Sequence, residues 1–592
     1  MKYPILDNLQ LNKEINTQFA GYNHQLSCQE GFFYDEKNVT LNYFPMLASR
    51  KRRKAVKVFT NFQGISSGTK IAWVDDGDLY YDGVKQTLST GIELDDKTYK
   101  TMVRMGAYIV IFPDKVWFNT SDATSGNIEQ TFTASNTSVT FQQVDSKGSN
   151  ITLWNGVGDP TDGAYKIDTK DGKSVLKVYS ATTNMWANVA TTYFKISLTN
   201  IGKDFKKGDG VKIEIDFTGI TWDRAKDIFV NDEGNGKRSS NFAIHERDDD
   251  YIIVVGLLDE ATKTFTLPSI YVGRECPDIE YVCECQNRLW GVKANGQEIY
   301  ACKLGDPTNW NCFAGISTDS WRATVGSDGV FTGAFAYMGN PLLFKENSLL
   351  RISISASGAH SYKEMICRGV QNGSSKSLVQ VNELLYYKSP TSVCVYDGNF
   401  PQEIGDEFGD VKYSLGVGGG WDNKYYLEME SDDGSSLFVY DVNVNMWAKE
   451  DNVSIYEFCN TEDTLFFVAS DKVAYAVEGE DYATDSDEYP LEDPVFWEAE
   501  SGFIGYQITD KKYLSRFAIR MNMEVGAEAW LYIEYDSSGK WEYVWNVSGK
   551  GTKTFAIPVR PKRCDHFRYK IKGHGACKMI ALTKEYGEGS DM

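Results

Sequence analysis

YVCECQNRLWGVKANGQEIYACKL, residues Tyr281 to Leu304, shows the pattern that repeats along this chain. An apolar run is followed by a short turn, a second run with Leu289 and Trp290, another turn and a third apolar run. Short aromatic-rich runs bounded by Gly, Asn and Asp are typical of β-strands joined by tight turns. Six further units resemble it: IAWVDDGDLYYDG (Ile71 to Gly83), AYIVIFPDKVWFNT (Ala107 to Thr120), AFAYMGNPLLFKENSLLRI (Ala334 to Ile352), LVQVNELLYYKSPTSVCVYDG (Leu378 to Gly398), SLGVGGGWDNKYYLEM (Ser414 to Met429) and TLFFVASDKVAYAV (Thr464 to Val477).

The spacing of these units predicts a β-propeller. Anchor residues in the last five units, Tyr281, Tyr337, Val381, Tyr425 and Phe466, are about 56, 44, 44 and 41 residues apart. A four-stranded propeller blade takes about 40 to 50 residues. One such unit cannot bury its apolar face alone, whereas several units placed radially bury one another. Seven units predict six to eight blades.

The spacing is interrupted once, which predicts an inserted domain. About 150 residues separate the second unit from the third, too many for a loop within a compact fold. After the last unit, the acidic segment Glu478 to Pro494 is typical of a linker, and alternating runs then resume. We expect an N-terminal arm (1–55), a first propeller part (56–120), an inserted β domain (121–270), a second propeller part (271–480), and a linker with a C-terminal β-sandwich (481–592).

The expected fold class is therefore all-β. It is a β-propeller of six to eight blades that carries an inserted β-sandwich-like domain and a C-terminal jelly-roll-like β-sandwich. Helical periodicity is almost absent, and no run approaches the roughly 20 apolar residues of a membrane-spanning helix. The first residues lack the apolar core of a signal peptide. We expect a soluble protein made in a cytoplasm, without a membrane partner.

The charge and the cysteines exclude some classes of function. The net charge of -21 argues against a general nucleic-acid-binding surface, because phosphate affinity needs clustered Lys and Arg. It suits a channel wall along which DNA must slide, and it equally suits a large protein that acidity keeps soluble. The 11 cysteines are an odd number without a C-x-x-C pair, which argues against a disulfide scaffold and a zinc ribbon.

One basic cluster stands out at the end of the arm. Arg50, Lys51, Arg52, Arg53 and Lys54 are consecutive in an otherwise acidic chain. They are a candidate assembly contact that anchors the arm on an acidic neighbour or on DNA. The other interpretation is a solvated strand edge that stays charged against aggregation. The sequence leaves both open.

No catalytic, metal or cofactor site is expected. The chain has no H-E-x-x-H, G-x-S-x-G or G-x-x-x-x-G-K-[ST] motif, and its five histidines never pair at metal-ligand spacing. The Asp-Gly turns fit hairpins better than the twelve-residue calcium loop. Among 82 acidic residues no pair is singled out as a glycosidase pair. We expect a protein that is not an enzyme.

Three stretches together resemble a family of bacteriophage tail proteins. They are the arm with Phe19 to His24, Phe44 to Leu47 and Arg50 to Arg53; the central Asn287 to Gly291, Ile299 to Ala301 and Leu304 to Trp310; and the ending Arg560 to Arg568. They resemble the packaged-DNA stabilisation, or tail nozzle, proteins. The resemblance covers about three quarters of the chain and leaves the inserted domain outside it.

The resemblance implies a structural component of the portal-to-tail conduit that retains packaged DNA and forms its exit path. It implies a virion protein in a homo-oligomeric ring, a hexamer before a dodecamer. The ring would contact other tail, adaptor or portal proteins and, transiently, the passing DNA. The alternative is a carbohydrate-binding or glycan-degrading tail propeller. A secreted propeller hydrolase is a third interpretation, against which the missing signal peptide and the unpaired cysteines argue.

Overall fold

The computed structural model describes residues 11–25, 27–170, 173–355, 358–479, 489, 491–505 and 511–588. Most of the predicted acidic linker, and the first ten residues, lie outside this range. The described chain is almost entirely β, which confirms the predicted class. Its helices are short: α1 (Ala225–Ile228) and the 3-10 turns η1 (Ser375–Ser377) and η2 (Asp406–Phe408).

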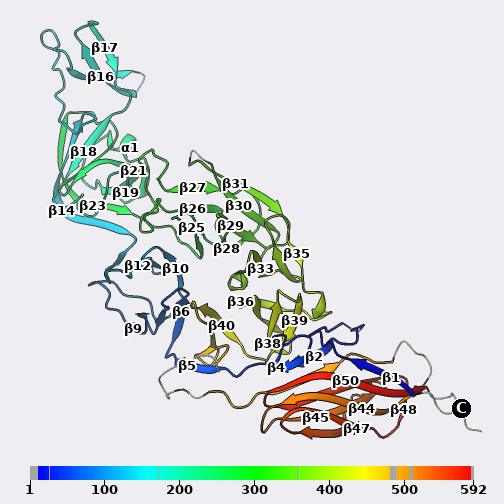
Figure 1. The fold of residues 1–592 in the computed structure, drawn as a ribbon. Helices are drawn as coiled ribbons and strands as arrows, with labels where there is room; N and C mark the ends of the chain where they lie inside the picture. The colour runs from blue at the N-terminus through cyan, green and yellow to red at the C-terminus, as the bar shows by residue number, and fades with distance from the viewer. Residues whose placement is uncertain are drawn as a thin grey trace, which may run out of the picture.

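Seven four-stranded antiparallel sheets form the middle of the molecule (Figure 1). Each of the seven sequence units lies in a different one of these sheets. In chain order, the sheets consist of β6 (Phe62–Ser66), β7 (Ala72–Asp75), β8 (Asp78–Tyr81) and β9 (Val84–Lys85); β10 (Thr101–Met105), β11 (Tyr108–Phe112), β12 (Val116–Asn119) and β13 (Ser125–Asn127); β24 (Tyr281–Glu284), β25 (Leu289–Val292), β26 (Glu298–Ala301) and β27 (Trp321–Thr324); β28 (Phe331–Tyr337), β29 (Asn340–Lys345), β30 (Ser348–Ile354) and β31 (His360–Ile366); β32 (Val379–Val381), β33 (Leu384–Lys388), β34 (Val393–Tyr396) and β35 (Gln402–Glu403); β36 (Ser414–Trp421), β37 (Lys424–Ser431), β38 (Gly434–Asp441) and β39 (Met446–Lys449); and β40 (Ile455–Asn460), β41 (Leu465–Ala469), β42 (Val473–Ala476) and β5 (Lys54–Val58).

These sheets close into a propeller-like ring. Each sheet shares an apolar cluster with the next, as where Val74 of β7 packs with Ile111 of β11. The last cluster joins Val468 of β41 to Phe59 and Trp73, so the seventh sheet meets the first. The seventh sheet takes its outer strand, β5, from the N-terminal arm, which pairs antiparallel with β42. The ring is thus closed by two parts of the chain that are about 400 residues apart.

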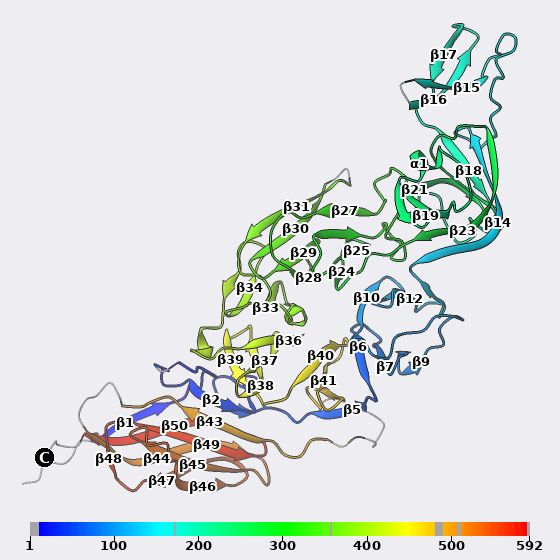
Figure 2. The same cartoon turned by 180° about the vertical axis from the view of Figure 1, so that it is seen from behind.

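The inserted segment folds around its own apolar core, between the second and third sheets of the ring. The predicted sandwich is wrong here, because β19 pairs with both β23 and β21 and so closes six strands into one sheet without edges. The strands are β14 (Gln130–Val144), β18 (Tyr193–Ser197), β19 (Gly210–Asp216), β21 (Lys237–Asp248), β22 (Tyr251–Val255) and β23 (Thr262–Arg274), with β20 (Asn231–Gly234) added on β21. A small sheet of β15 (Tyr165–Lys170), β16 (Lys173–Ser180) and β17 (Met185–Asn188) extends beyond it (Figure 2).

The C-terminal part consists of two sheets around one core. The first contains β3 (Val39–Thr40), β4 (Leu47–Ser49), β50 (Cys577–Glu588), β44 (Lys512–Met523) and β47 (Gly551–Pro558), with β1 (Leu11–Asn16) on β50 and β48 (Arg563–Cys564) on β44. The second contains β2 (Phe33–Lys37), β43 (Phe496–Ser501), β49 (Phe567–His574), β45 (Glu528–Tyr535) and β46 (Glu542–Ser548).

The arm therefore supplies strands to two parts of the molecule. Four of its strands, β1 to β4, complete the sandwich, and β5 completes the ring. Both views show an elongated molecule with the sandwich at one end, the ring in the middle and the inserted domain at the other end (Figures 1 and 2).

Candidate functional site

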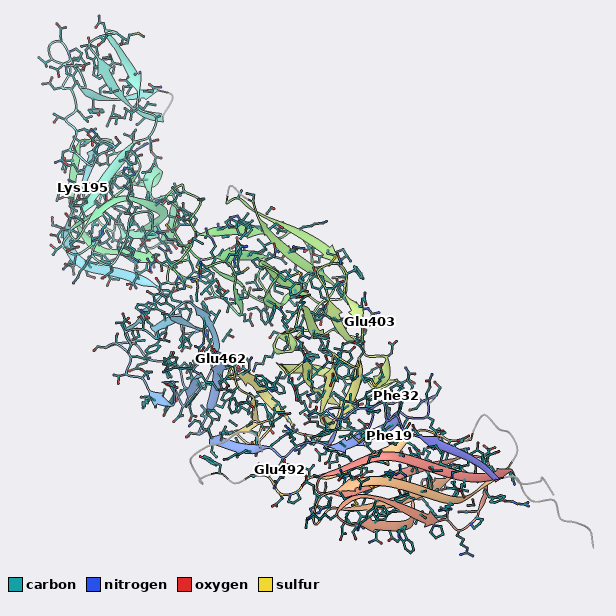
Figure 3. The ribbon with its side chains drawn as sticks, viewed as in Figure 1. Phe19, Phe32, Lys195, Glu403, Glu462 and Glu492 are labelled. Atoms are coloured by element: carbon teal, nitrogen blue, oxygen red, sulfur yellow. The ribbon has the colours of Figure 1, made fainter. Side chains whose placement is uncertain are left out.

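The basic cluster Arg50 to Lys54 lies where the arm passes from the sandwich to the ring. β4 of the sandwich ends at Ser49, and β5 of the ring begins at Lys54. Glu492, labelled in Figure 3, lies close to this connection and belongs to the segment that leads into β43. The cluster therefore sits at the junction of three segments that are far apart in the sequence.

Arg53 is buried, with 6% of its surface exposed, and pairs with two carboxylates that follow β39. Its Nη2 lies 2.6 Å from Oε2 of Glu450, and its Nη1 lies 2.8 Å from Oδ2 of Asp451. The guanidinium also stands over the ring of Phe467, 5.0 Å from its centroid. Burial raises the pKa of Asp451, but the charges of Arg53 and Arg50 outweigh it, and the net shift is downward.

Arg50 is equally buried and connects the sandwich to the linker. It donates two hydrogen bonds to Glu492, of 2.7 and 2.8 Å, and its Nε donates a third, of 2.7 Å, to Oδ1 of Asn38. The backbone N–H of Arg53 donates to the same Glu492 carboxylate at 2.9 Å. Burial raises the pKa of Glu492, and the bonds from Arg50 more than reverse that shift.

The cluster is thus divided between two environments. Arg50 and Arg53 are buried, whereas Lys51, Arg52 and Lys54 are half-buried. Lys51 lies 3.1 Å from Glu478. That the cluster contacts another subunit stays a prediction, and the side chains with accessible surface for it are Lys51, Arg52 and Lys54.

A second buried ion pair lies within the inserted domain, where the domain meets the ring. Asp209, which precedes β19, has no exposed surface. Its Oδ2 lies 3.0 Å from Nη1 of Arg274, and its Oδ1 accepts a 2.7 Å hydrogen bond from Nδ2 of Asn309. Asn309 belongs to Leu304 to Trp310, one of the stretches that carry the family resemblance. In this chain that stretch holds the inserted domain against the third sheet.

The other central stretch, Asn287 to Gly291, also has a structural role. Trp290 has no exposed surface and lies in the core between the third and fourth sheets. Arg288 donates hydrogen bonds to the carbonyls of Cys302 and Asp319, both at 2.7 Å. These residues hold the turns of the third sheet in place.

The interior of the ring is crossed by a contact between opposite sheets. The first strands β6, β10, β24 and β28 contact one another in order, as do β32, β36, β40 and β6, so these strands face the interior. Tyr99 precedes β10, and Lys376 lies in η1 before β32, about three sheets away around the ring. The Lys376 ammonium lies 3.7 Å from the centroid of the Tyr99 ring and donates a 2.8 Å hydrogen bond to the carbonyl of Tyr456.

Glu457 completes this contact from the seventh sheet. Its carboxylate accepts a hydrogen bond from the Tyr99 hydroxyl and lies 4.0 Å from the Lys376 ammonium. Burial raises the pKa of Glu457 and lowers that of Lys376. Beside this contact is a cavity of about 390 Å³, with Gln380, Asn460 and glycines of β36 in its wall. The contact therefore joins three parts of the ring across its interior.

Three further features concern possible metal-binding groups, a cavity with acidic residues in its wall, and helices that could span a membrane. Within the ranges that the structure describes, His, Cys, Asp and Glu side chains nowhere gather in a group of three or more that could hold a metal ion. The acid-rich turn Asp75 to Asp78 borders a cavity of about 820 Å³, whose wall also contains Glu93 and Asp95. In the described part of the chain, no helix is long and apolar enough to cross a bilayer.

No family model and no curated protein matches this chain. Among solved structures, it is similar to Hsv2 of Kluyvelomyces marxianus (10% identity, 39% of this chain and 66% of that chain covered, TM-score 0.24) and to Hsv2 of Kluyveromyces lactis (11%, 49% and 88%, TM-score 0.25). It is also similar to an exo-β-1,3-galactanase of Phanerochaete chrysosporium, with 9% identity, 75% of this chain and 100% of that chain covered, and a TM-score of 0.18.

Proposed function

We propose that this protein is a structural subunit of a bacteriophage tail, in the portal-to-tail conduit or nozzle, where it retains packaged DNA and lines its exit path. The proposal begins from the resemblance of the arm, the central stretches and the ending to packaged-DNA stabilisation proteins. Under this proposal the subunit is not an enzyme. It works in the virion as one member of a ring of identical copies.

The finer fold is part of this proposal. We infer that the seven four-stranded sheets are the blades of one propeller, because each shares a core with its neighbours and the arm strand β5 completes the last one. We infer a jelly-roll-like sandwich for the two C-terminal sheets. In this arrangement the propeller is the body of the subunit, and the other two parts reach outward from it.

The observation that carries the proposal is the contact across the propeller interior. Lys376 and Tyr99 approach to 3.7 Å there, whereas the major groove of a DNA duplex alone is about 12 Å wide. DNA therefore cannot pass along the axis of one propeller. If this subunit lines a DNA path, the path lies between copies, which requires a closed ring around it.

The joints between the parts support a structural role. The sandwich meets the propeller through Arg50, Arg53 and the carboxylates that they bind, and the inserted domain meets it through the hydrogen bond from Asn309 to Asp209. Removing one partner of a buried ion pair such as Arg53 and Glu450 costs about 3–5 kcal/mol, because the other charge stays buried without compensation. Such joints hold the three parts of the subunit in fixed positions. A rigid subunit suits the wall of a channel that must keep its width under the pressure of packaged DNA.

The experiment is imaging of the assembled phage particle with symmetry averaging, with this chain fitted into the tail density. We expect a ring of this subunit on the portal axis, with DNA or an open bore between copies. A particle in which the chain is monomeric, or lies off the axis as a peripheral fibre, would contradict the proposal. Density for a glycan held in the propeller or the inserted domain would favour the carbohydrate-binding alternative instead.

A further inference from the structure

The C-terminal sandwich has one side where both sheets end in an unpaired strand. β46 pairs only with β45, and β47 pairs only with β44, among the strand pairings of the described residues. The two strands follow each other through a short turn at Gly549 and Lys550. Figure 2 shows both strands on the side of the sandwich that faces away from the propeller, and Figure 1 shows β47 there too. We call β46, β47 and the following residues 559–563 the free side.

The free side presents two long strand edges, and Lys553 and Pro558 on β47 are the kinds of residue that limit pairing with other strands. Edge strands in monomeric proteins are short, covered or interrupted, because unpaired N–H and C=O groups recruit other chains. Here β46 has seven residues and β47 has eight. β46 also exposes two large aromatic side chains, Tyr543 at 57% and Trp545 at 50%. Tyrosine and tryptophan are enriched in protein interfaces, where they bury a large apolar area at low entropy cost.

The charge of the free side is opposite to that of the rest of the molecule. Lys550, Lys553 and Arg560 are exposed on it, and no ion pair joins them to a carboxylate of the described residues. Residues 495–592 contain 15 Lys and Arg against 12 Asp and Glu, a net charge of +3, while the whole chain carries -21. Residues 1–494 therefore carry -24. The basic end of one copy complements the acidic body of another.

We propose that the free side binds the acidic propeller-bearing part of a second copy of this chain, head to tail. This inference rests on the proposed function and assigns a surface to its ring contact. A head-to-tail contact joins two different surfaces and generates a ring when the rotation closes. A contact between two free sides would bring Lys550 and Lys553 against their own copies, and like charges oppose it. In the ring, the exposed edges and Trp545 become buried between subunits.

The test uses the full-length protein, measured by light scattering and analytical ultracentrifugation over a range of concentrations. The main variant combines Tyr543→Ser, Trp545→Ser, Lys550→Glu and Lys553→Glu. A second variant changes only Lys550→Glu and Lys553→Glu and keeps the aromatic packing. The matched control is Lys147→Glu with Lys203→Glu, two exposed lysines of the inserted domain. Circular dichroism and the melting temperature establish that each variant is folded.

We expect the wild type and the control to assemble alike, the double variant to need at least tenfold higher concentration, and the fourfold variant to stay monomeric. Raising the salt concentration should weaken wild-type assembly, because it screens opposite charges. Assembly that salt strengthens would instead indicate contact between two free sides and would overturn the proposal. If folded variants assemble like the wild type, the free side is not the contact, while the proposed ring stands. If the wild type is monomeric at every concentration, this inference fails, while the ring in the particle is decided by the imaging described above.

Discussion

Replacing Glu36 by glutamine should remove a loss of stability that the wild type undergoes as the pH rises. Glu36 lies at the joint between the propeller and the sandwich. Glu36 is 1% exposed, on β2 of the sandwich. Its Oε2 accepts a 3.2 Å hydrogen bond from the backbone N–H of Lys449, which ends β39 of the propeller, and its Oε1 has no partner among the described residues. Burial raises the pKa of Glu36 to about 8, and the neighbouring charge of Asp35 adds to the increase.

The direction of this pKa shift determines whether the free energy of unfolding rises or falls with pH. In the unfolded chain the carboxyl ionises near its ordinary pKa of 4.5, but in the folded chain only near 8. Between these values the unfolded state holds fewer protons, so the free energy of unfolding falls as the pH rises. One pKa unit corresponds to about 1.4 kcal/mol, so a shift of this size costs the wild type up to about 4 kcal/mol between pH 4.5 and pH 8. The glutamine side chain of the variant has no proton to lose in this range and avoids that cost.

The assay is urea unfolding of the full-length wild type and Glu36→Gln at pH 5 and pH 8. The change in their stability difference between the two pH values isolates Glu36, because all other groups titrate in both proteins. We expect the variant to gain stability relative to the wild type at the higher pH. Glu528→Gln, an exposed position at the start of β45, is the control and should change little. Parallel pH profiles for wild type and Glu36→Gln would refute the reasoning.

Three further predictions concern two buried side chains and the half-buried residues of the basic cluster. Arg53→Met should lower the free energy of unfolding by about 3 kcal/mol, because it removes the nearer of the two cations that pair with Glu450 and Asp451 and leaves only Arg50, at 4.0 and 3.5 Å. Urea unfolding at constant pH measures this, and a change below about 1 kcal/mol would contradict it. Trp290→Ala should cost about 3–5 kcal/mol by emptying the core between two sheets, seen as a lower melting temperature. Changing Lys51, Arg52 and Lys54 together to Ser should reduce incorporation into particles while the isolated protein stays folded, and wild-type incorporation would count against an assembly role.

The repeat was visible in the sequence because the strands and turns of each unit depend on residues that are close together in the chain. Units such as Tyr281 to Leu304 alternate apolar strands with turn residues, and turn chemistry acts over a few positions. Their arrangement in a propeller followed from the spacing. The inserted domain was detected for the same reason, but its closure was not, because the pairing of β19 with both β21 and β23 depends on register between distant strands.

The partners of the candidate site could not be predicted. Arg50 and Arg53 meet Glu450, Asp451 and Glu492 across about 400 residues, and among 82 acidic residues nothing local marks these three. The same holds for Tyr99 and Lys376, which approach only because the ring brings opposite sheets together. Sequence patterns report which face of a strand is buried. They do not report which distant charge lies opposite it.

The pairing of β5 with β42 has a consequence for biosynthesis. Strand β5 (Lys54–Val58) leaves the ribosome early, but its partner β42 (Val473–Ala476) is translated about 400 residues later. At roughly 5–20 residues per second, the nascent strand waits about 20 to 80 s with its hydrogen-bonding groups unpaired. During that interval, strands β1 to β4 wait as well, because the C-terminal sandwich is made last. The N-terminal region of the growing chain is therefore the natural target for a chaperone that binds extended segments.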